Sequence, residues 1–303
     1  YDVIILGSGP AGLTAAIYTT RANLKTLIVA GKVWGGQLMI TSVVENYPGF
    51  PEGIMGPELM ANMRKQAEKH GAEIVDTDFT EADFSKRPFT VKAGEQTSET
   101  NSVIIATGAN TKWMDVPGEK GLIGRGISSC APCDAAFFRG KKVIVVGGGD
   151  TAMEEALYLT RFVESLTIVH RRDTLRASHI MQERAKNNPK ISFLWDSVVA
   201  EVQGKDRVVG VRLKNLKTNE EKNLPIDGVF VAIGLVPNTS VLKGIDLDEK
   251  GYVRIADHTK TNVEGVFVAG DVHDAHYKQA VTAAGFGCMA ALDLERWFSE
   301  KGE

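Results

Sequence analysis

Apolar runs separated by a glycine-rich turn and a longer mixed stretch occur twice along this chain. The first set starts with the run Val3 to Leu6, continues through GSGPAG and an alanine-rich stretch, and closes with the run Thr26 to Val29. Short apolar runs bounded by turn residues are typical of buried strands, and the stretch between them is long enough for a helix. The pattern predicts a βαβ unit at the start of the chain.

The second set repeats this plan in the middle of the chain. An apolar run from Val143 to Val146 leads into GGGDTA, a predicted helix from Asp150 to Phe162 and an apolar run from Leu166 to Val169. Two such units far apart indicate two Rossmann-like dinucleotide-binding domains rather than one six-stranded domain. The predicted fold class is therefore α/β, and 303 residues are enough for two domains.

Three further apolar runs end in or next to glycine. They lie at 101 to 108, at 228 to 234, and at Val266 to Val268, where Ala-Gly-Asp follows. A glycine at a strand end lets another group approach the backbone. The alanine-rich stretch at 279 to 298 predicts a terminal helix.

Charge and composition narrow the class of protein. The 35 basic and 38 acidic residues nearly balance, so no global field attracts nucleic acid or anionic lipid, and we expect neither as a partner. No window approaches the run of about 18 apolar residues that a membrane helix needs. Three cysteines do not form a secreted disulfide framework, so we expect a cytoplasmic protein and find no targeting pattern in the given sequence.

The first glycine turn fits the dinucleotide-binding pattern G-x-G-x-x-G. Its first glycine makes the tight turn, its second lets a pyrophosphate approach the backbone, and its third lets helix and strand pack closely. The helix N-terminus supplies amide donors for the phosphates. The acid expected roughly 20 positions further on, to bind ribose, is replaced by Ala30, Gly31 and Lys32. The candidate cofactor ligands of this turn are Gly7, Ser8, Gly9, Pro10, Ala11 and Gly12.

The second glycine turn fits G-x-G-x-x-A and is followed by a basic cluster where a site for NADH would carry an acid. The guanidinium group of arginine can form two parallel hydrogen bonds with a 2′-phosphate. Basic runs are usually solvated surface turns, but this one follows the second strand of a dinucleotide unit, which favours NADPH. The candidate ligands are Gly147, Gly149, Asp150, Thr151, His170, Arg171, Arg172 and Arg176.

Cys130 and Cys133, in the segment CAPCD, admit three interpretations. A zinc site needs four ligands, and no second cysteine pair or close histidine pair accompanies them, so we expect no metal. A structural disulfide across so short a loop would constrain little. A redox pair is favoured, since a cysteine that opens a helix can have a lowered thiol pKa. Asp134 is a candidate proton donor and acceptor if partly buried, although it is equally an ordinary first-turn carboxylate.

Two dinucleotide sites and one dithiol suggest a path for electrons. A nicotinamide gives a hydride, whereas a dithiol exchanges with another disulfide one thiolate at a time. A two-electron carrier is needed between them, and a flavin supplies that chemistry. We therefore predict FAD at the first dinucleotide site and NADPH at the second.

Several motifs occur in an order that characterises one family of enzymes. They are GSGPAG, GGQL, ENYPG, CAPCD, GGGDTAMEEA, HRRD, and GVFVAGDV followed by QAVTAAGFGCMAALDLE. With these motifs spread over nearly its whole length, the chain resembles the low-molecular-weight, bacterial and archaeal type of thioredoxin reductase, in the pyridine nucleotide-disulfide oxidoreductase family. The resemblance implies a homodimeric thioredoxin-disulfide reductase whose partner is thioredoxin or a thioredoxin-like protein.

The resemblance also implies a domain plan and a set of site residues. An FAD domain, residues 1–111 and 241–303, is split around an NADPH domain, residues 112–240, which swivels about its two connections. Cys130 attacks the thioredoxin disulfide, Cys133 meets the flavin, and Asp134 handles the proton. The further FAD contacts implied are Gly36, Gln37, Asn46, Thr107, Gly108, Gly270, Asp271, Gln279 and Ala280.

Residues beside the cysteines depart from the family pattern or suggest a partner surface. Pro132 lies where threonine or valine is more common and can shift the potential of the dithiol. The pair at 135 and 136 is alanine where glycine is common. Phe137, Phe138 and Arg139 could anchor a protein partner, although adjacent phenylalanines more often divide between core and surface.

Three rival functions fit parts of the pattern. A flavin dithiol oxidase of similar fold is opposed by the intact GGGDTA and HRRDTLR segments. A flavoprotein reductase of the same build without a dithiol is opposed by the C-x-x-C segment. A non-enzymatic sensor of NADPH would be excluded by steady turnover with a disulfide substrate.

Overall fold

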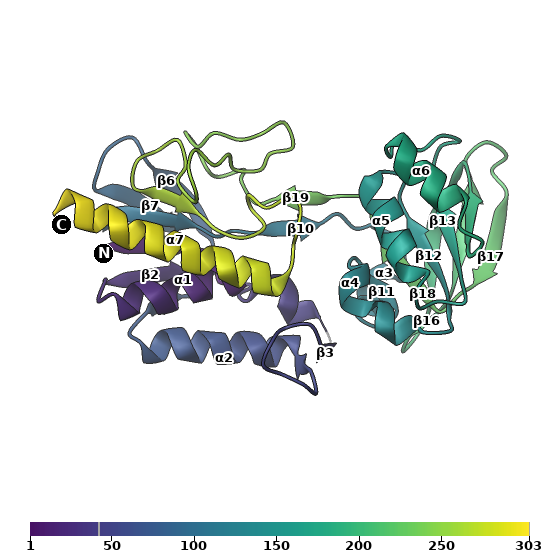
Figure 1. Cartoon of the computed structure of the whole chain (residues 1–303), viewed down its shortest axis with the longest axis horizontal. Coiled ribbons are helices and arrows are strands. Elements are labelled where there is room, and N and C mark those ends of the chain that lie inside the picture. Colours follow the sequence, from purple (N-terminus) through teal and green to yellow (C-terminus); the bar gives the residue numbers. More distant parts are fainter. Residues whose placement is uncertain (42, 303) are drawn as a thin grey trace. The chain divides into compact units, whose positions relative to one another are not determined.

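A computed structural model describes residues 1–41 and 43–302 of the chain. The chain divides into two compact units. Unit 1 consists of Tyr1–Asn110 and Val236–Glu303, and unit 2 consists of Thr111–Leu235. Unit 2 is therefore an insertion in unit 1, as the colours of Figure 1 show.

Unit 1 is built on a five-stranded parallel sheet with the strand order β20-β9-β1-β2-β5. Val3 at the start of β1 lies opposite Thr26 of β2 and Ser102 of β9. Helix α1 (Pro10–Arg21) connects β1 to β2, which gives the predicted βαβ unit. The strands are β1 (Val3–Leu6), β2 (Thr26–Val29), β5 (Glu73–Val75), β9 (Ser102–Ile105) and β20 (Val266–Val268).

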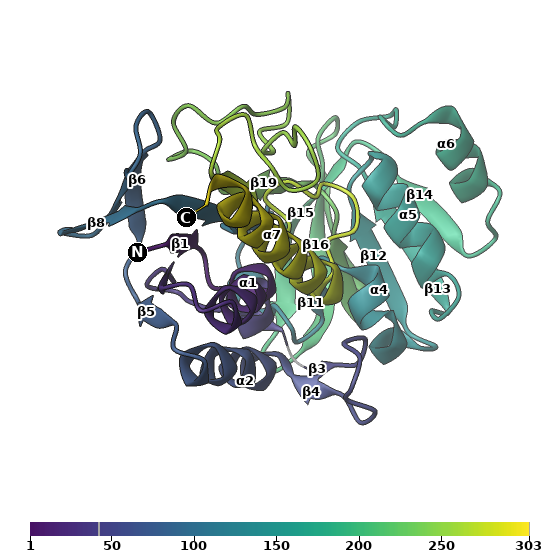
Figure 2. The ribbon, with the colours of Figure 1, turned by 60° about the vertical axis from the view of Figure 1, so that its left-hand side comes forward.

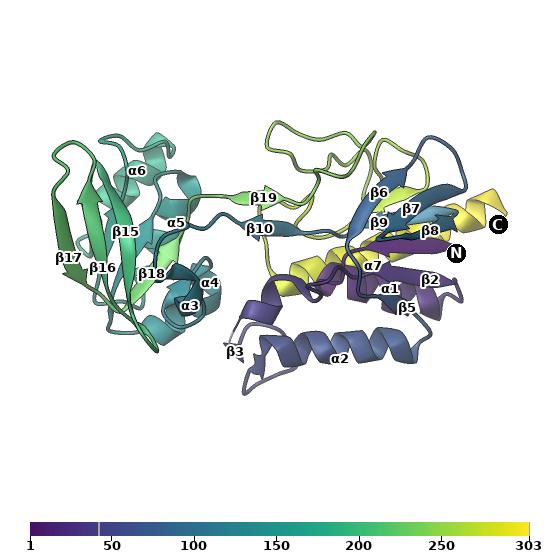
Figure 3. The ribbon, with the colours of Figure 1, turned by 180° about the vertical axis from the view of Figure 1, so that it is seen from behind.

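Both faces of this sheet are covered, which explains why β1 is apolar throughout. Ile5 packs into a core with helices α1, α2 (Gly56–Lys69) and α7 (Ala280–Lys301). Ile4 and Leu6 point to the opposite face and pack on the antiparallel sheet of β6 (Phe79–Asp83), β7 (Phe89–Ala93) and β8 (Gln96–Thr100). Figures 2 and 3 show α1 and α7 side by side on the helical face.

Unit 2 repeats this architecture around the parallel sheet β11-β18-β12-β13-β14. Val145 of β12 packs beneath helix α5 (Asp150–Leu159). Ile144 points the other way, onto the antiparallel sheet of β15 (Ser197–Gly204), β16 (Val208–Asn215) and β17 (Glu221–Pro225). The parallel strands are β11 (Ile127–Ser128), β12 (Lys142–Val146), β13 (Ser165–Val169), β14 (Ile191–Leu194) and β18 (Gly228–Val231).

Shorter elements complete the two units. Unit 1 also contains the 3-10 helix η1 (Gly36–Ile40) and strands β3 (Val43–Val44) and β4 (Ile54–Met55). Unit 2 also contains helices α3 (Glu119–Leu122), α4 (Ala131–Asp134), η2 (Ala135–Phe138) and α6 (His179–Lys186). Among the described residues, no helix is both long and apolar enough to cross a membrane.

Two paired strands, β10 (Ala109–Thr111) and β19 (Leu235–Pro237), form the connections between the units. The return connection comes earlier than the expected boundary between residues 240 and 241, because Asn238 is already fixed to unit 1. Its side-chain amide donates to the Thr107 carbonyl at 2.8 Å, and the Thr107 hydroxyl donates to the Asn238 carbonyl at 2.8 Å.

Helix α5 ends at Leu159, before the predicted end at Phe162. The Lys190 ammonium donates to the carbonyls of Thr160 and Val163, at 2.8 Å each. Carbonyls at the end of a helix lack partners within it. This cation therefore stabilises the early stop.

Candidate functional site

In the glycine turn after β1, two glycines pack closely against backbone atoms and a third faces open space. Gly7 has φ +112°, and a Cβ on it would overlap the Ala106 carbonyl at the end of β9. A Cβ on Gly12 would overlap the Gly7 carbonyl. A Cβ on Gly9 would meet no atom within 4 Å, so space remains beside the first turn of α1. These are the three conditions that a pyrophosphate-binding turn requires.

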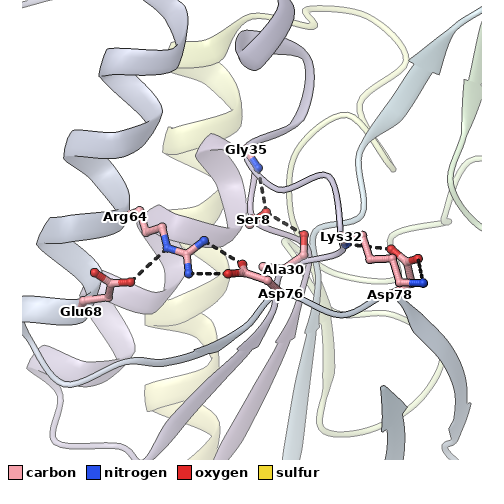
Figure 4. Close-up of polar contacts among 8 residues, drawn as sticks. All are labelled: Ser8, Ala30, Lys32, Gly35, Arg64, Glu68, Asp76 and Asp78. Carbon is pink, nitrogen blue, oxygen red and sulfur yellow. Dashed lines mark hydrogen bonds and ion pairs between the residues drawn. The ribbon is translucent and has the colours of Figure 1, made fainter. Parts of the chain in front are cut away.

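Ser8 uses its side chain to close the loop that follows β2. Its hydroxyl donates to the Ala30 carbonyl at 2.8 Å and accepts from the Gly35 N–H at 2.9 Å (Figure 4). Lys32 stands where the ribose-binding acid was expected, and its N–H donates to Asp78 at 2.9 Å. The Ser8 hydroxyl is therefore occupied within the protein, and Ser8 offers its backbone to a ligand on the open side of the turn.

An ion-pair cluster supports the same loop from below. The Arg64 guanidinium contacts both oxygens of Asp76, at 2.7 and 3.0 Å, and Glu68 at 3.0 Å (Figure 4). It also lies 4.8 Å from the centre of the Trp34 ring. The role of Arg64 was not predicted from the sequence. Trp34 and Asp76 are distant from it along the chain, and the pairing with Glu68 four residues later is common on helix surfaces.

Other residues predicted for the first site converge from distant parts of unit 1. The Gln37 amide donates to the Ala109 carbonyl at 3.2 Å, and the Asn46 amide donates to the Gln279 side chain at 3.2 Å. A Cβ on Gly270 would come within 2.8 Å of the Ala11 Cβ. The position of a Cβ on Gly36, next to Gln37, is likewise only 3.6 Å from the Gly9 Cα, so segments distant in sequence reach the glycine turn.

Asp271, directly after Gly270, has a buried carboxylate oxygen, Oδ1, without a hydrogen-bond partner among the described residues. Burial, with a further contribution from the negative charge of Asp274, raises the pKa of Asp271 to about 6. A buried acceptor without a donor is costly. A cofactor that offers a hydroxyl donor here would satisfy it, so the residues fit a dinucleotide with polyol hydroxyls.

The second glycine turn, after β12, has the same construction. A Cβ on Gly147 would overlap the Ala232 carbonyl at the end of β18, whereas one on Gly149 would meet no atom within 4 Å. Asp150 begins α5 and accepts from the Ser178 N–H at 2.8 Å. Thr151 is exposed at the same helix start. The second turn therefore also leaves open space beside a helix N-terminus.

Three exposed arginines follow β13 near this turn: Arg171, Arg172 and Arg176. The neighbouring acids Asp173 and Asp196 are both bound by Lys217, at 3.0 Å each. Lys217 thus neutralises the adjacent carboxylates and leaves the guanidinium groups available for an anion.

His170 is buried, with 6% of its surface exposed, and its ring lies against Gly148. The Nε2 atom is 3.0 Å from the Thr174 carbonyl. Burial is the main cause that lowers the pKa of His170, and Arg176 adds to it. The neutral ring therefore supports the glycine turn from inside, and its predicted contact with a cofactor stays a prediction.

Cys130 and Cys133 form a disulfide at the start of α4. Cys130 caps the helix: its carbonyl accepts from the N–H groups of Cys133 and Asp134, at 3.2 Å each. The Cys130 N–H donates to the Ser128 hydroxyl at 3.1 Å. Pro132 is exposed in the first turn, where a helix needs no N–H from it. The segment places both sulfurs within one turn, as predicted from their spacing.

Asp134 is partly buried behind the disulfide. Burial raises the pKa of Asp134, while a hydrogen bond with Ser128 opposes the rise. A carboxyl group with a raised pKa can hold a proton nearer to neutral pH. In the described part of the chain, no cluster of three or more His, Cys, Asp or Glu side chains is placed to hold a metal ion.

Comparison with known proteins identifies this arrangement. Residues 1–287 match the family model described as pyridine nucleotide-disulphide oxidoreductase. The chain belongs to this family.

Relatives and solved structures agree over almost the entire length. The chain is 55% identical to a thioredoxin reductase from Streptomyces coelicolor over 298 residues, which covers 97% of this chain and 92% of that one. It is 50% identical to a thioredoxin reductase from Mycolicibacterium smegmatis, with 99% and 97% covered. A crystal structure of thioredoxin reductase from Streptococcus pyogenes superimposes with a TM-score of 0.94 at 42% identity, and covers 99% of this chain and 98% of that one.

The family defines the enzyme class. The chain is a flavoprotein disulfide reductase with FAD and NADPH as cofactors, and the α/β fold predicted from the sequence is confirmed. Both glycine turns, the unpartnered oxygen of Asp271 and the three available arginines fit these groups.

Asp271 gives a prediction about pH and stability. Because its pKa rises from the ordinary 3.8 to about 6 on folding, the unfolded chain loses this proton first, and the free energy of unfolding falls as pH rises from about 4 through 6. In FAD-free protein, Asp271→Asn should raise the free energy of unfolding at pH 8 by about 3 kcal/mol and change it little at pH 4. Urea denaturation at both pH values measures this. An equal gain from Asp206→Asn, an exposed control, would contradict it.

Proposed function

We propose that the chain is a thioredoxin-disulfide reductase, which passes two electrons from NADPH through FAD to the Cys130–Cys133 disulfide and then to thioredoxin or a thioredoxin-like protein. The observation that carries the proposal is this disulfide at the start of a helix, in the same unit as a glycine turn and an exposed arginine cluster. A relative from Mycobacterium leprae, 51% identical, is named a bifunctional thioredoxin reductase/thioredoxin. That name supports thioredoxin as the partner.

The bound cofactors would supply hydride donation and two-electron storage. The residues of the chain hold them in place. In unit 1, the glycine turn from Gly7 to Gly12 would bind the FAD pyrophosphate through its amides, and Asp271 would accept from a cofactor hydroxyl. In unit 2, the turn from Gly147 to Thr151 would bind NADPH, with the arginines on its 2′-phosphate.

The dithiol then transfers its electrons by thiol-disulfide exchange. The Cys130 thiolate attacks one sulfur of the partner, the partner disulfide breaks, and a mixed disulfide forms. Cys133 next attacks Cys130, which restores the Cys130–Cys133 disulfide and releases the partner as a dithiol. Asp134 would move the proton that Cys133 loses, consistent with its partial burial and raised pKa.

Of the two adjacent phenylalanines after the dithiol, one is buried and the other is exposed, which leaves an apolar side chain for a partner protein. Phe138 is buried against Phe230, with ring centres 5.0 Å apart, whereas Phe137 is 39% exposed. The Arg139 guanidinium lies 5.3 Å from the centre of the Phe162 ring. We assign Phe137 and Arg139 to an apolar anchor with a basic rim for the disulfide protein.

Three properties implied by the family remain proposals. The strands β10 and β19 would act as the connections about which unit 2 swivels. The free thiol of Cys288 fits a cytoplasmic, reducing location. A homodimer is supported by exposed apolar side chains on helices α1 and α7.

Helix α7 exposes an unusually apolar face. Val281, Met289 and Leu292 are 41%, 43% and 38% exposed, and Tyr18 of the adjacent helix α1 is 41% exposed. Exposed apolar side chains that gather on one helix face mark an interaction surface. We assign a second copy of the chain as the occupant, because a twofold dimer places the same patch of both subunits against each other.

The order of electron transfer gives the principal test of the proposed activity. Cys133→Ser should abolish NADPH-dependent reduction of thioredoxin, because the exchange cannot be completed without the second sulfur. NADPH should still bleach the visible band of the bound FAD. Stopped-flow absorbance measures both steps, with Cys288→Ser as the control that keeps turnover. Equal loss of flavin reduction in Cys133→Ser would refute the assigned order.

The arginine cluster gives a test of cofactor choice. Replacing Arg171, Arg172 and Arg176 by alanine should raise KM for NADPH about a hundredfold in total. Charge-assisted hydrogen bonds contribute roughly 1.5–3 kcal/mol each when shielded from water, and these exposed side chains contribute less. KM for NADH should change little. Steady-state kinetics with both nucleotides measures this, and Arg184→Ala, which removes one exposed arginine of α6 outside the cluster, is the control for a change of surface charge. A proportional rise for both nucleotides would remove the 2′-phosphate assignment.

The apolar face of α7 gives a test of assembly. The double variant Met289→Glu and Leu292→Glu should convert the dimer to a monomer, because both carboxylates would be buried without partners. Sedimentation velocity measures the mass. Val209→Glu, at a residue 57% exposed in unit 2, should leave the dimer intact. A wild-type protein that sediments as a monomer would contradict this assignment.

A further inference from the structure

Helix α5 contacts the dithiol segment through one carboxylate. Glu155 accepts a hydrogen bond from the backbone N–H of Ala131 through its Oε2 atom. Ala131 is fully buried and is the first residue of α4, next to Cys130. The same helix α5 begins at the glycine turn of the NADPH unit. Glu155 thus connects the helix of the nucleotide site to the residue between the two cysteines.

This contact belongs to a longer face of the same chain segment. Glu155 and Tyr158 are three residues apart and lie on one side of α5. The Phe162 ring, in the turn beyond the end of α5, stacks on Tyr158 with ring centres 5.7 Å apart and so continues this face. The Phe162 carbonyl accepts from the Gly140 N–H at 3.0 Å, just past the end of η2. The chain from Glu155 to Phe162 therefore contacts the start of α4 and the residue just past the end of η2. Glu155 makes the contact at the start of α4, next to Cys130.

The helices that carry the dithiol or pack against it contain four acidic side chains. Helix α5 carries Asp150, Glu154 and Glu155, α4 carries Asp134, and η2 carries none. Asp150 accepts from the Ser178 N–H, on the far side of the glycine turn, and Glu154 is exposed. Asp134 follows Cys133 and is partly buried. Glu155 is the α5 carboxylate that contacts the backbone of the dithiol segment.

We propose that Glu155 is the positioning residue of the dithiol: its carboxylate holds Ala131, and its negative charge makes the Cys130 thiolate harder to form. The inference rests on the proposed function, in which Cys130 is the attacking thiol. Reduction of the disulfide breaks the S–S bond and adds two electrons, and each sulfur takes a proton unless it remains a thiolate. A nearby carboxylate favours the thiol over the thiolate.

The consequence concerns how strongly the dithiol reduces a partner. A pair whose reduced thiolate is stabilised becomes a stronger oxidant, since its reduced form persists. Glu155 instead destabilises the Cys130 thiolate and with it the reduced form of the pair. The dithiol therefore gives up its electrons more readily, which suits a protein that must reduce another disulfide.

A conservative substitution separates the charge of Glu155 from its hydrogen bond. Glu155→Gln keeps an oxygen acceptor for the Ala131 N–H but removes the charge. Glu155→Ala removes both. Glu154→Gln removes the same charge from the next residue of the same helix, where the side chain is exposed, and is the matched control.

The experiment measures alkylation of Cys130 by iodoacetamide as a function of pH, in full-length protein carrying Cys133→Ser. Mass spectrometry of the Cys130 peptide excludes the signal of Cys288. Glu155→Gln should lower the pH midpoint and speed alkylation at pH 7 by about threefold to tenfold, as expected for loss of a partly shielded charge. Glu154→Gln should change the rate less than about twofold. No change in Glu155→Gln, or equal changes in both variants, would overturn the proposal.

Hydrogen exchange tests the positioning role separately. Glu155→Ala should speed amide exchange in the peptide spanning residues 127 to 139, whereas Glu155→Gln should leave it near the wild-type rate. Faster exchange in neither variant would refute the role of the hydrogen bond. Neither measurement uses NADPH, turnover or a protein partner. Failure of the proposed function would instead appear as a wild-type enzyme that does not reduce thioredoxin with NADPH.

Discussion

Both units of this protein depend on one close contact, in which a glycine lies against the backbone at the end of a neighbouring strand. Gly7 lies against Ala106, and Gly147 lies against Ala232, so closely that neither position has room for a Cβ. Each contact lies where the chain passes from the first strand of a βαβ unit, β1 or β12, into a helix. The second glycine of each turn then faces open space at the helix start, which is where a phosphate group can meet backbone amides. Both cofactor sites depend on these two contacts.

The same architecture, used twice, gives the units different tasks through the residues added to it. In unit 1, segments distant in sequence gather around the turn, including Asp271 with its unpartnered oxygen. In unit 2, Lys217 occupies the acids beside the arginine cluster, and a short helix between β11 and β12 carries the disulfide. Nucleotide binding and disulfide chemistry thus share one helix, α5, through Glu155.

The sequence predicted those elements whose pattern is local. The strand, glycine turn and helix of each βαβ unit were visible because apolar runs, glycine spacing and helix length all agree, and the cysteine spacing indicated a pair within one turn. The antiparallel sheets β6 to β8 and β15 to β17 were not predicted, because their exposed edge strands, such as β17, carry few apolar residues. Glu155, Arg64 and Lys217 were also missed. Their roles depend on partners that only the folded chain brings near, such as Ala131 for Glu155.

In the proposed function, electrons pass from NADPH through the flavin to the dithiol and then to a disulfide protein. The most direct measurement is the visible spectrum of the holoenzyme under nitrogen, first with NADPH and then with oxidised thioredoxin. The account predicts that the flavin band bleaches with NADPH and returns on addition of thioredoxin disulfide. A band that returns only when oxygen is admitted would contradict the account and would indicate an oxidase.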